Sequence, residues 1–311
     1  MNYQTTRKAL QGVAFTTAIP FTDNSEKNIK YEDYKNNLQA IEDAGGQLYI
    51  PCGNTGEYYS LTHDERVNVS SSTVEAVSTD SVVIAGVAGS TKTVKKLSEE
   101  YNSLGVDGIM IMHPDHTYLH ETGIEQYYRN IAKATDLPVV LYKRGPEISN
   151  KVVTKLAGVE NIIGIKYAVN DIEGFSKIVE SVPNDFVCVN GIAERFAPAF
   201  ALEGAEGFTT GIGNFVPELP LKLHSALSNN NFEQARRIRN LARPYETLRA
   251  ESGDNNRISA ANNIPAVKYG MDLAGLEGGP VREPLVNLSG SDRQRAEKYY
   301  SEIMDSTIPI E

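Results

Sequence analysis

Short apolar runs alternate with longer segments of helical period along most of the chain. The helical segments include residues 31–45 and 93–105. Eight apolar runs can be counted, and they span residues 12–20, 47–53, 82–89, 107–112, 138–142, 161–166, 186–191 and 205–211. Continuous apolar runs between helices are typical of parallel strands that are buried on both faces.

Eight such units predict an α/β fold in which the strands close into a (β/α)8 TIM barrel. A doubly wound open sheet is the alternative, but the chain lacks the GxGxxG turn expected there. Thr62 and Glu65 form a T-x-x-E capping box and should begin one of the helices. The last unit ends near residue 228. We therefore expect a barrel over residues 1–228 and a C-terminal helical region over residues 229–311, packed on the barrel.

The composition limits the classes of binding partner and the cellular compartment in which we expect the protein. The 30 Lys and Arg residues against 40 Asp and Glu residues give a net charge of −10, which disfavours nucleic acid and anionic membranes. Cys52 and Cys188 lack metal-type spacing and argue against a disulfide framework. The first residues lack the apolar region of a signal peptide, and no apolar run approaches the roughly 18–20 residues that span a bilayer. We expect a soluble cytoplasmic protein.

Lys166 closes the sixth apolar run, and Tyr142 closes the fifth. In a barrel both would lie at the carboxyl ends of adjacent strands, about 4.8 Å apart, where catalytic groups gather. Burial can lower a lysine pKa by several units, which yields a neutral amine that can attack a carbonyl. A phenol beside it could carry protons to and from the carbinolamine. The alternatives are a surface lysine at the strand end and a tyrosine that fills the end of the barrel.

Candidate binding residues lie on the loops after the strands. A tight turn at residues 53–56 would leave the amides of Asn54 and Thr55 to hold a carboxylate, although an ordinary turn would look the same. Arg144 lies two residues beyond Tyr142. Its guanidinium suits a two-pronged contact with a carboxylate, although most loop arginines are simply solvated.

Two glycine-rich turns follow the last two strands, at residues 190–194 and 209–215. Such turns often bind phosphate in barrels, but they could equally hold substrate hydroxyls or begin helices, with Asn214 as a cap. The candidate substrate-binding residues of these turns are Gly191, Ile192 and Thr209. His116, on the loop after the fourth strand, is a further possible site residue, although a lone loop histidine is more often solvated.

Three motifs together resemble those of the dihydrodipicolinate synthase / N-acetylneuraminate lyase family of class I aldolases. They are GNTGE at 53–57, LY at 141–142 and NIIGIK at 161–166. The resemblance covers nearly the whole chain and implies a TIM barrel with C-terminal helices, usually assembled as a tetramer. It implies that Lys166 forms an imine, that Tyr142 shuttles protons and that the loop at Asn54 and Thr55 holds a carboxylate. It implies no metal and no organic cofactor, because the imine itself stabilises the carbanion-like intermediate.

Within the family, the chain is most similar to the 5-dehydro-4-deoxyglucarate dehydratase branch. The segments that carry this similarity are 142–144, 193–208, 214–217 and 279–285. Two departures from that branch are Lys143, where asparagine is usual, and Asn54, where glycine is usual. Compared with dihydrodipicolinate synthases, Asn54 replaces a threonine, and Asp115 and His116 replace a tyrosine pair, so hydroxyls of a proton relay are missing.

The expected function is therefore a Schiff-base lyase of a 2-oxo acid, which dehydrates and decarboxylates 5-dehydro-4-deoxyglucarate, with Arg144 on the distal carboxylate. The alternative is 4-hydroxy-tetrahydrodipicolinate synthase or another pyruvate-dependent aldolase. Two further possibilities are a phosphate-binding barrel enzyme that uses Gly191, Gly211 and Gly213, and a keto-acid-binding regulator without turnover. We expect a homo-oligomer, either a dimer or a tetramer, with a small 2-oxo acid as its ligand.

Overall fold

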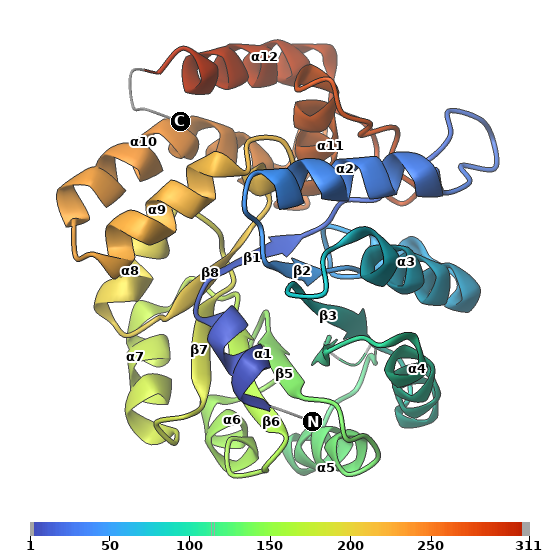
Figure 1. Cartoon of the computed structure of the whole chain (residues 1–311), viewed down its shortest axis with the longest axis vertical. Helices are drawn as coiled ribbons and strands as arrows, with labels where there is room; N and C mark the ends of the chain where they lie inside the picture. The colour runs from blue at the N-terminus through green and yellow to red at the C-terminus, as the bar shows by residue number, and fades with distance from the viewer. Residues whose placement is uncertain (1–2, 113, 115, 307–311) are drawn as a thin grey trace.

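Eight parallel strands close into a barrel, each paired with its neighbours in chain order and β1 paired with β8 (Figure 1). The computed structural model describes residues 3–112, 114 and 116–306. The strands are β1 Val13–Thr16, β2 Leu48–Ile50, β3 Val82–Val87, β4 Gly108–Ile111, β5 Val139–Lys143, β6 Ile162–Tyr167, β7 Val187–Asn190 and β8 Gly207–Thr210. Each of the eight predicted apolar runs overlaps one of these strands. Six runs contain their strand whole, whereas β5 and β6 extend one residue beyond their runs, to Lys143 and Tyr167. Every strand residue is buried. The predicted (β/α)8 barrel is confirmed.

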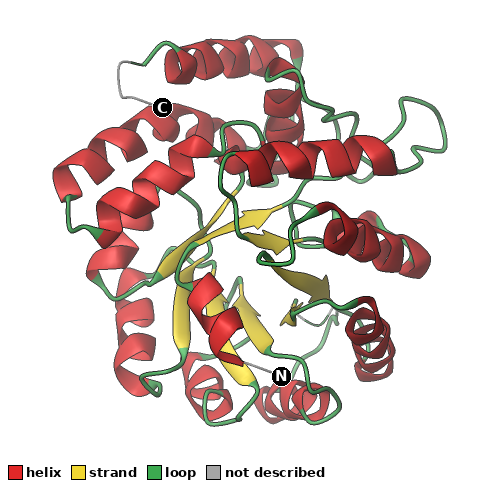
Figure 2. Ribbon diagram, viewed as in Figure 1, coloured by secondary structure: helices red, strands yellow, loops and turns green. Residues whose placement is uncertain are grey.

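Helices form an outer ring around the yellow strands of Figure 2. After the strands come α2 Tyr31–Asp43, α3 His63–Ala76, α4 Thr91–Leu104, α5 Glu121–Ala132, α6 Asn150–Leu156, α7 Ile172–Ser181, α8 Ala197–Leu202 and α9 Glu218–Ser228. Single 3₁₀ turns, η1 Tyr58–Ser60 and η2 Ile212–Asn214, follow β2 and β8. The sequence pattern did not predict α1, Tyr3–Leu10, which contacts β1, β3, β6 and β7 and lies in front of the barrel in Figure 1.

Three helices follow the last strand–helix unit: α10 Phe232–Ala250, α11 Asn263–Leu273 and α12 Gly290–Met304. α10 packs along α9, and α12 packs against both α10 and α11, so that these helices lie together beside one sector of the barrel (Figure 1). The division into a barrel of residues 1–228 and a separate C-terminal region stays a prediction, since α9 and α10 pack as closely as neighbouring barrel helices.

Two predictions about helix starts have opposite outcomes. The capping box is confirmed: the Thr62 side chain accepts from the Glu65 amide, and the Glu65 carboxylate accepts from the Thr62 amide. The prediction that Asn214 caps a helix is wrong, because α9 begins after Pro217. The Asn214 side chain instead accepts from the Ala18 amide and donates to the Thr16 carbonyl, which ties β8 to β1. Within the described residues, no helix is both long and apolar enough to cross a membrane.

Candidate active site

A cavity of about 580 Å³ opens at the carboxyl ends of the strands. Tyr142 from β5, Lys166 from β6 and Thr209 from β8 line it, as do residues of the loops after β2 and β7. Every site residue predicted from the sequence except His116 lies on its wall. The residues in question are Asn54, Thr55, Tyr142, Arg144, Lys166, Gly191, Ile192 and Thr209.

Lys166 lies beside Tyr142 across the β5–β6 ladder, as the adjacent strand ends predict. Its Nζ lies 4.7 Å from the centroid of the Tyr142 ring, and only 6 % of the residue is exposed. Burial, followed by the charges of Arg144 and Arg249, lowers the pKa of Lys166 to about 7. A substantial fraction of the amine is therefore neutral at physiological pH, which a nucleophilic amine requires. The alternative of a solvated surface lysine is excluded.

The phenol of Tyr142 is also buried, and its oxygen accepts a 2.9 Å hydrogen bond from the side-chain amide of Asn54. Burial raises the pKa of Tyr142 to about 12, and the charge of Arg144 opposes this rise. The phenol therefore stays protonated over the physiological range. Because Asn54 donates to the oxygen, the phenol hydrogen points elsewhere and is available to a group in the cavity.

The loop after β2 presents Thr55 to the barrel interior. The Thr55 and Thr16 hydroxyl oxygens lie 3.1 Å apart, and the Thr16 hydroxyl donates to the Thr210 carbonyl at 2.6 Å. Since Thr16 has one hydroxyl hydrogen, Thr55 must be the donor between the two. The loop is closed by a turn in which the Glu57 amide donates to the Asn54 carbonyl at 3.0 Å. Thr55 is thus held against the end of β1, and it lines the same cavity as Lys166.

Gly191 lies against the side chain of Lys166. A Cβ at Gly191 would lie 2.8 Å from Cγ of Lys166 and 2.9 Å from Cβ of Ala168, closer than carbon atoms can approach. The absence of a side chain thus leaves room for the lysine stem. Ile192 is half-buried on the same wall, and its amide donates to the Asn190 side chain.

Arg144 is exposed at the cavity rim, just after β5 ends at Lys143. The chain bends back there because the buried ammonium of Lys143 donates to the carbonyls of Gly145 and Ile148, at 3.0 and 2.5 Å. Arg144 therefore lies on a turn that the hydrogen bonds of the Lys143 side chain stabilise. Its guanidinium is in reach of a ligand in the cavity, as the spacing from Tyr142 suggested.

His116 is exposed and lines an adjoining groove of about 720 Å³ that shares Asn54, Tyr142 and Arg144 with the cavity. Its Nδ1 accepts from the Tyr118 amide at 3.0 Å. A role for His116 in the site stays a prediction. Asp115, which together with His116 replaces the tyrosine pair of dihydrodipicolinate synthases, lies outside the described residues.

Three polar residues that the sequence did not indicate come from α10 and α11. The Arg249 guanidinium pairs with the Glu246 carboxylate and donates to the Asn263 side chain at 2.7 Å, and all three line the cavity. The Arg249 guanidinium packs directly against Gly211, where a Cβ would lie only 2.2 Å from one of its nitrogens. Glu246 and Arg249 are spaced i, i+3 on α10, a pattern that usually means an exposed helical pair. Here the pair is buried.

Behind this pair lies a further carboxyl group, Glu194, which is fully buried and hydrogen-bonded to the Thr210 hydroxyl. Burial, followed by the charge of Glu246, raises the pKa of Glu194. Two carboxyl groups therefore share one arginine, and the proton that Glu194 retains keeps the cluster close to neutral.

The glycine amides considered for a phosphate are already occupied. The Gly191 amide donates to the Tyr167 carbonyl at 2.7 Å, and the Gly213 amide donates to the Thr210 hydroxyl at 2.8 Å. The Arg249 side chain covers the remaining position, Gly211. A phosphate site built on Gly191, Gly211 and Gly213 is therefore not supported.

Known proteins match this chain over most of its length. Residues 10–303 match the family model described as "Dihydrodipicolinate synthetase family". A 4-hydroxy-tetrahydrodipicolinate synthase of Methanosarcina barkeri is 31 % identical over 296 residues, covering 92 % of this chain and 95 % of the relative.

Two solved structures named dihydrodipicolinate synthase share both fold and sequence with the chain. The one from Oceanobacillus iheyensis has 32 % identity and a TM-score of 0.92, covering 98 % of this chain and 100 % of the other. The one from Bacillus clausii has 34 % identity and a TM-score of 0.90, covering 95 % and 98 %. The chain therefore belongs to the dihydrodipicolinate synthetase family, whose members are Schiff-base lyases of the class I aldolase type.

Proposed function

We propose that Lys166 is the nucleophile of this lyase and forms an imine with the ketone of a 2-oxo acid. The observation that carries the proposal is a buried lysine with a pKa of about 7, set against the phenol of Tyr142. A lysine at its usual pKa would be neutral in only about one molecule in a few thousand at pH 7. With a pKa of about 7, a substantial fraction of the molecules carries the reactive amine.

The steps follow from the two side chains. The neutral Lys166 amine adds to the ketone carbon, and the oxygen that gains the electron pair takes a proton, which gives a carbinolamine. The Tyr142 phenol then protonates the departing hydroxyl, so that water leaves and a protonated imine remains. The Tyr142 phenolate then takes a proton from the adjacent carbon, and the electrons of that C–H bond move toward the imine nitrogen. The resulting enamine can add to an aldehyde or expel a hydroxyl group.

The carboxylate of the 2-oxo acid is assigned to the loop after β2. Asn54 and Thr55 line the same cavity as Lys166, at a turn that the hydrogen bond from the Glu57 amide to the Asn54 carbonyl closes. Backbone amides bind a carboxylate without an additional cation, which matters because a cation here would further lower the lysine pKa.

The names of the relatives favour the reaction of a 4-hydroxy-tetrahydrodipicolinate synthase over that of the glucarate dehydratase. The curated and solved relatives described above are named as synthases of the dihydrodipicolinate type. We therefore propose pyruvate as the first ketone and an aldehyde as its acceptor, as in a 4-hydroxy-tetrahydrodipicolinate synthase. We further propose a cytoplasmic homo-oligomer, dimer or tetramer.

Dehydration of 5-dehydro-4-deoxyglucarate remains the second candidate, and one contact supports it. Asn54 donates an amide hydrogen to the Tyr142 oxygen, whereas a threonine hydroxyl could both donate and accept there. An amide does not relay a proton, so a hydroxyl relay through this position is absent. Arg144, an exposed cation on the cavity wall, is the residue that we propose to bind a second, distal carboxylate.

Borohydride reduction in the presence of pyruvate tests the shared mechanism. We expect one covalent adduct in the intact mass, and peptide mapping should place it on Lys166 and not on the neighbouring buried lysine, Lys143. Lys166→Ala should give no adduct. An unmodified mass for the unaltered protein would overturn the proposal. Turnover of pyruvate with aspartate semialdehyde, compared with turnover of 5-dehydro-4-deoxyglucarate, then decides between the two reactions.

A further inference from the structure

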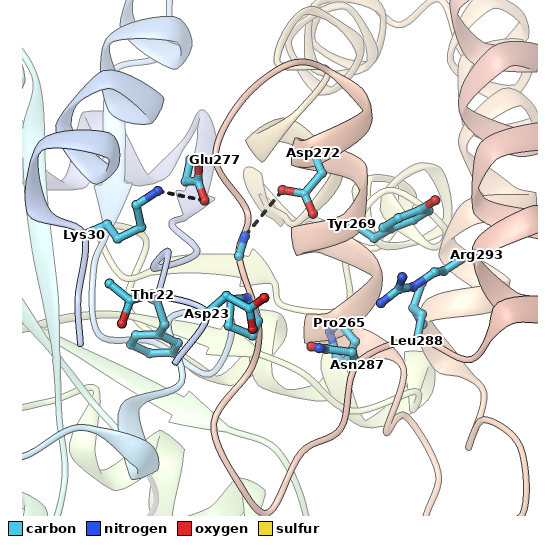
Figure 3. Close-up of a pocket in the computed structure, with 13 residues that line it drawn as sticks. Thr22, Asp23, Lys30, Pro265, Tyr269, Asp272, Glu277, Asn287, Leu288 and Arg293 are labelled. Atoms are coloured by element: carbon cyan, nitrogen blue, oxygen red, sulfur yellow. Dashed lines mark hydrogen bonds and ion pairs between the residues drawn. The ribbon is translucent and has the colours of Figure 1, made fainter. Parts of the chain in front are cut away.

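Residues 277–285, here called the C-terminal strap, link α11 to α12 and lie between two cavities. Pro284 and Leu285 line the active-site cavity. On the other side, Glu277, Gly279 and Pro280 line a separate cavity of about 440 Å³ (Figure 3). The sequence analysis singled out residues 279–285 for their similarity to other family members, but the mechanism above gives them no role.

Both α11 and the strap are joined to the loop after β2 through the buried carboxylate of Glu57. Nζ of Lys268, on α11, lies 2.6 Å from a carboxylate oxygen of Glu57, and the two side chains are 2 % and 0 % exposed. The same ammonium donates to the Pro280 carbonyl of the strap at 2.7 Å. The other Glu57 oxygen accepts from the Arg282 amide at 3.0 Å. One carboxylate thus binds both α11 and the strap.

The side chain of Arg282 reinforces the same junction from the solvent side. It makes a two-pronged contact with the Glu65 carboxylate, at 2.6 and 2.8 Å, and donates to the carbonyls of Lys27 and Ser60. Its guanidinium also lies 4.3 Å from the centroid of the Phe21 ring. Glu65 lies in the first turn of α3, so the strap is tied both to the segment between β2 and α3 and to the start of α3.

The far side of the strap is also tethered. Lys30 and Glu277 form an ion pair in the wall of the second cavity, with 3.0 Å between Nζ and the carboxylate oxygen (Figure 3). Asp272 accepts from the Gly278 amide at 2.9 Å. A Cβ at Gly278 would lie 2.0 Å from the Lys268 carbonyl, so the strap passes directly over α11. It is held on both sides and cannot shift without breaking these contacts.

We infer that Lys268 and Arg282 are positioning residues, which fix the turn from Asn54 to Glu57 and thereby set the affinity for the substrate carboxylate. This inference rests on the proposed function of that turn. Glu57 closes the turn through its own amide, and its left-handed backbone, with φ of 51°, is strained for a residue other than glycine. The contacts of its side chain hold this conformation in place. They act on binding, since none of them touches Lys166 or Tyr142.

The test uses the full chain and measures trapping by borohydride as a function of pyruvate concentration. Lys268→Met leaves the Glu57 carboxylate buried without its cation, so the turn should rearrange. We expect the half-saturating pyruvate concentration to rise at least about tenfold, while the maximal trapping rate falls less than about threefold. In Glu57→Gln/Lys268→Met the pair is neutral, and the new side-chain amide oxygen can still accept from the Arg282 amide. This double variant should return to within about threefold of the unaltered chain.

Lys35→Met is the matched control, because Lys35 also pairs with a carboxylate, Glu75, at 2.8 Å but lies at the surface away from the cavity. It should leave the half-saturating concentration unchanged. Arg282→Ala keeps the buried pair and provides a second variant if Lys268→Met does not fold. It should raise the same concentration.

Each outcome has a defined meaning. An unchanged half-saturating concentration in Lys268→Met or Arg282→Ala overturns the inference, as does a rise that persists in the double variant. A loss of maximal rate alone would mean that these residues only support the fold, and it also overturns the inference. Absence of trapping in the unaltered chain would overturn the proposed function together with the inference, so the two failures can be distinguished.

Discussion

Replacing Lys166 by methionine should make the protein inactive and more stable. Methionine keeps the length of the side chain and suits the apolar wall around it. The folded protein holds the pKa of Lys166 at about 7, whereas in the unfolded chain it has the ordinary lysine value of 10.5. At 1.36 kcal/mol per pKa unit, the buried ammonium costs at most about 5 kcal/mol at pH values below 7. The methionine variant does not carry this cost.

The increase in the free energy of unfolding should depend on pH, because the folded and unfolded chains bind different numbers of protons. Between pH 7 and 10.5 the unfolded chain binds a proton that the folded protein has released, so the stability of the unaltered protein rises with pH. The advantage of Lys166→Met should therefore be largest at about pH 6, at roughly 3–5 kcal/mol, and fall below about 1 kcal/mol near pH 10. Urea unfolding followed by circular dichroism at several pH values measures it.

Lys35→Met serves as the control, because that lysine lies at the surface and pairs with Glu75. It should bring no gain at low pH. A gain for Lys166→Met that is equal at all pH values would mean that packing, and not the lowered pKa, causes it. A loss of stability at about pH 6 would refute the claim that the buried ammonium is costly in the folded protein.

Three further predictions concern the cavity wall. Tyr142→Phe should lower turnover by roughly 10²–10⁴ while borohydride still traps an adduct, and an unchanged rate would remove the phenol from the mechanism. Arg144→Ala should lower kcat/KM by roughly 10–150-fold for a dicarboxylate such as 5-dehydro-4-deoxyglucarate, but much less for pyruvate. An equal effect on both substrates would refute a distal-carboxylate role. Gly211→Ala should displace the Arg249 guanidinium and lower the thermal midpoint, whereas Gly123→Ala, where a Cβ meets nothing within 4 Å, should not. Equal midpoints for the two glycine variants would mean that Arg249 can move aside at no cost.

The sequence indicated those parts of the site that depend on local patterns. Lys166 and Tyr142 end two continuous apolar runs, and the regular alternation of strands and helices places such ends together. The tight turn at Asn54 and Thr55 could be predicted from the glycines on either side of it, Gly53 and Gly56. Each of these inferences needs only a few neighbouring residues and the rule that parallel strands share a carboxyl edge.

The remaining parts depend on contacts between distant segments. Glu246 and Arg249 look like an exposed pair on α10, and only the packing of α10 against other helices and of Arg249 against Gly211 buries them. Glu194 lies in a segment noted for its similarity to relatives, yet nothing local shows that it meets Thr210. The contact between Asn54 and Tyr142 joins residues 88 positions apart. Patterns within one element carry no information about such partners.

The strap has a consequence for the order in which the chain becomes functional during synthesis. The contact between Glu57 and Lys268 closes a loop of more than 200 residues, and the contact with Arg282 closes a longer one. Contacts of such long range form late in folding, because the entropy of closing the loop must be overcome first. A chain still attached to the ribosome could close the barrel once β8 has emerged. Its carboxylate turn would stay unanchored until the strap follows, so ketone capture should begin only when synthesis is almost complete.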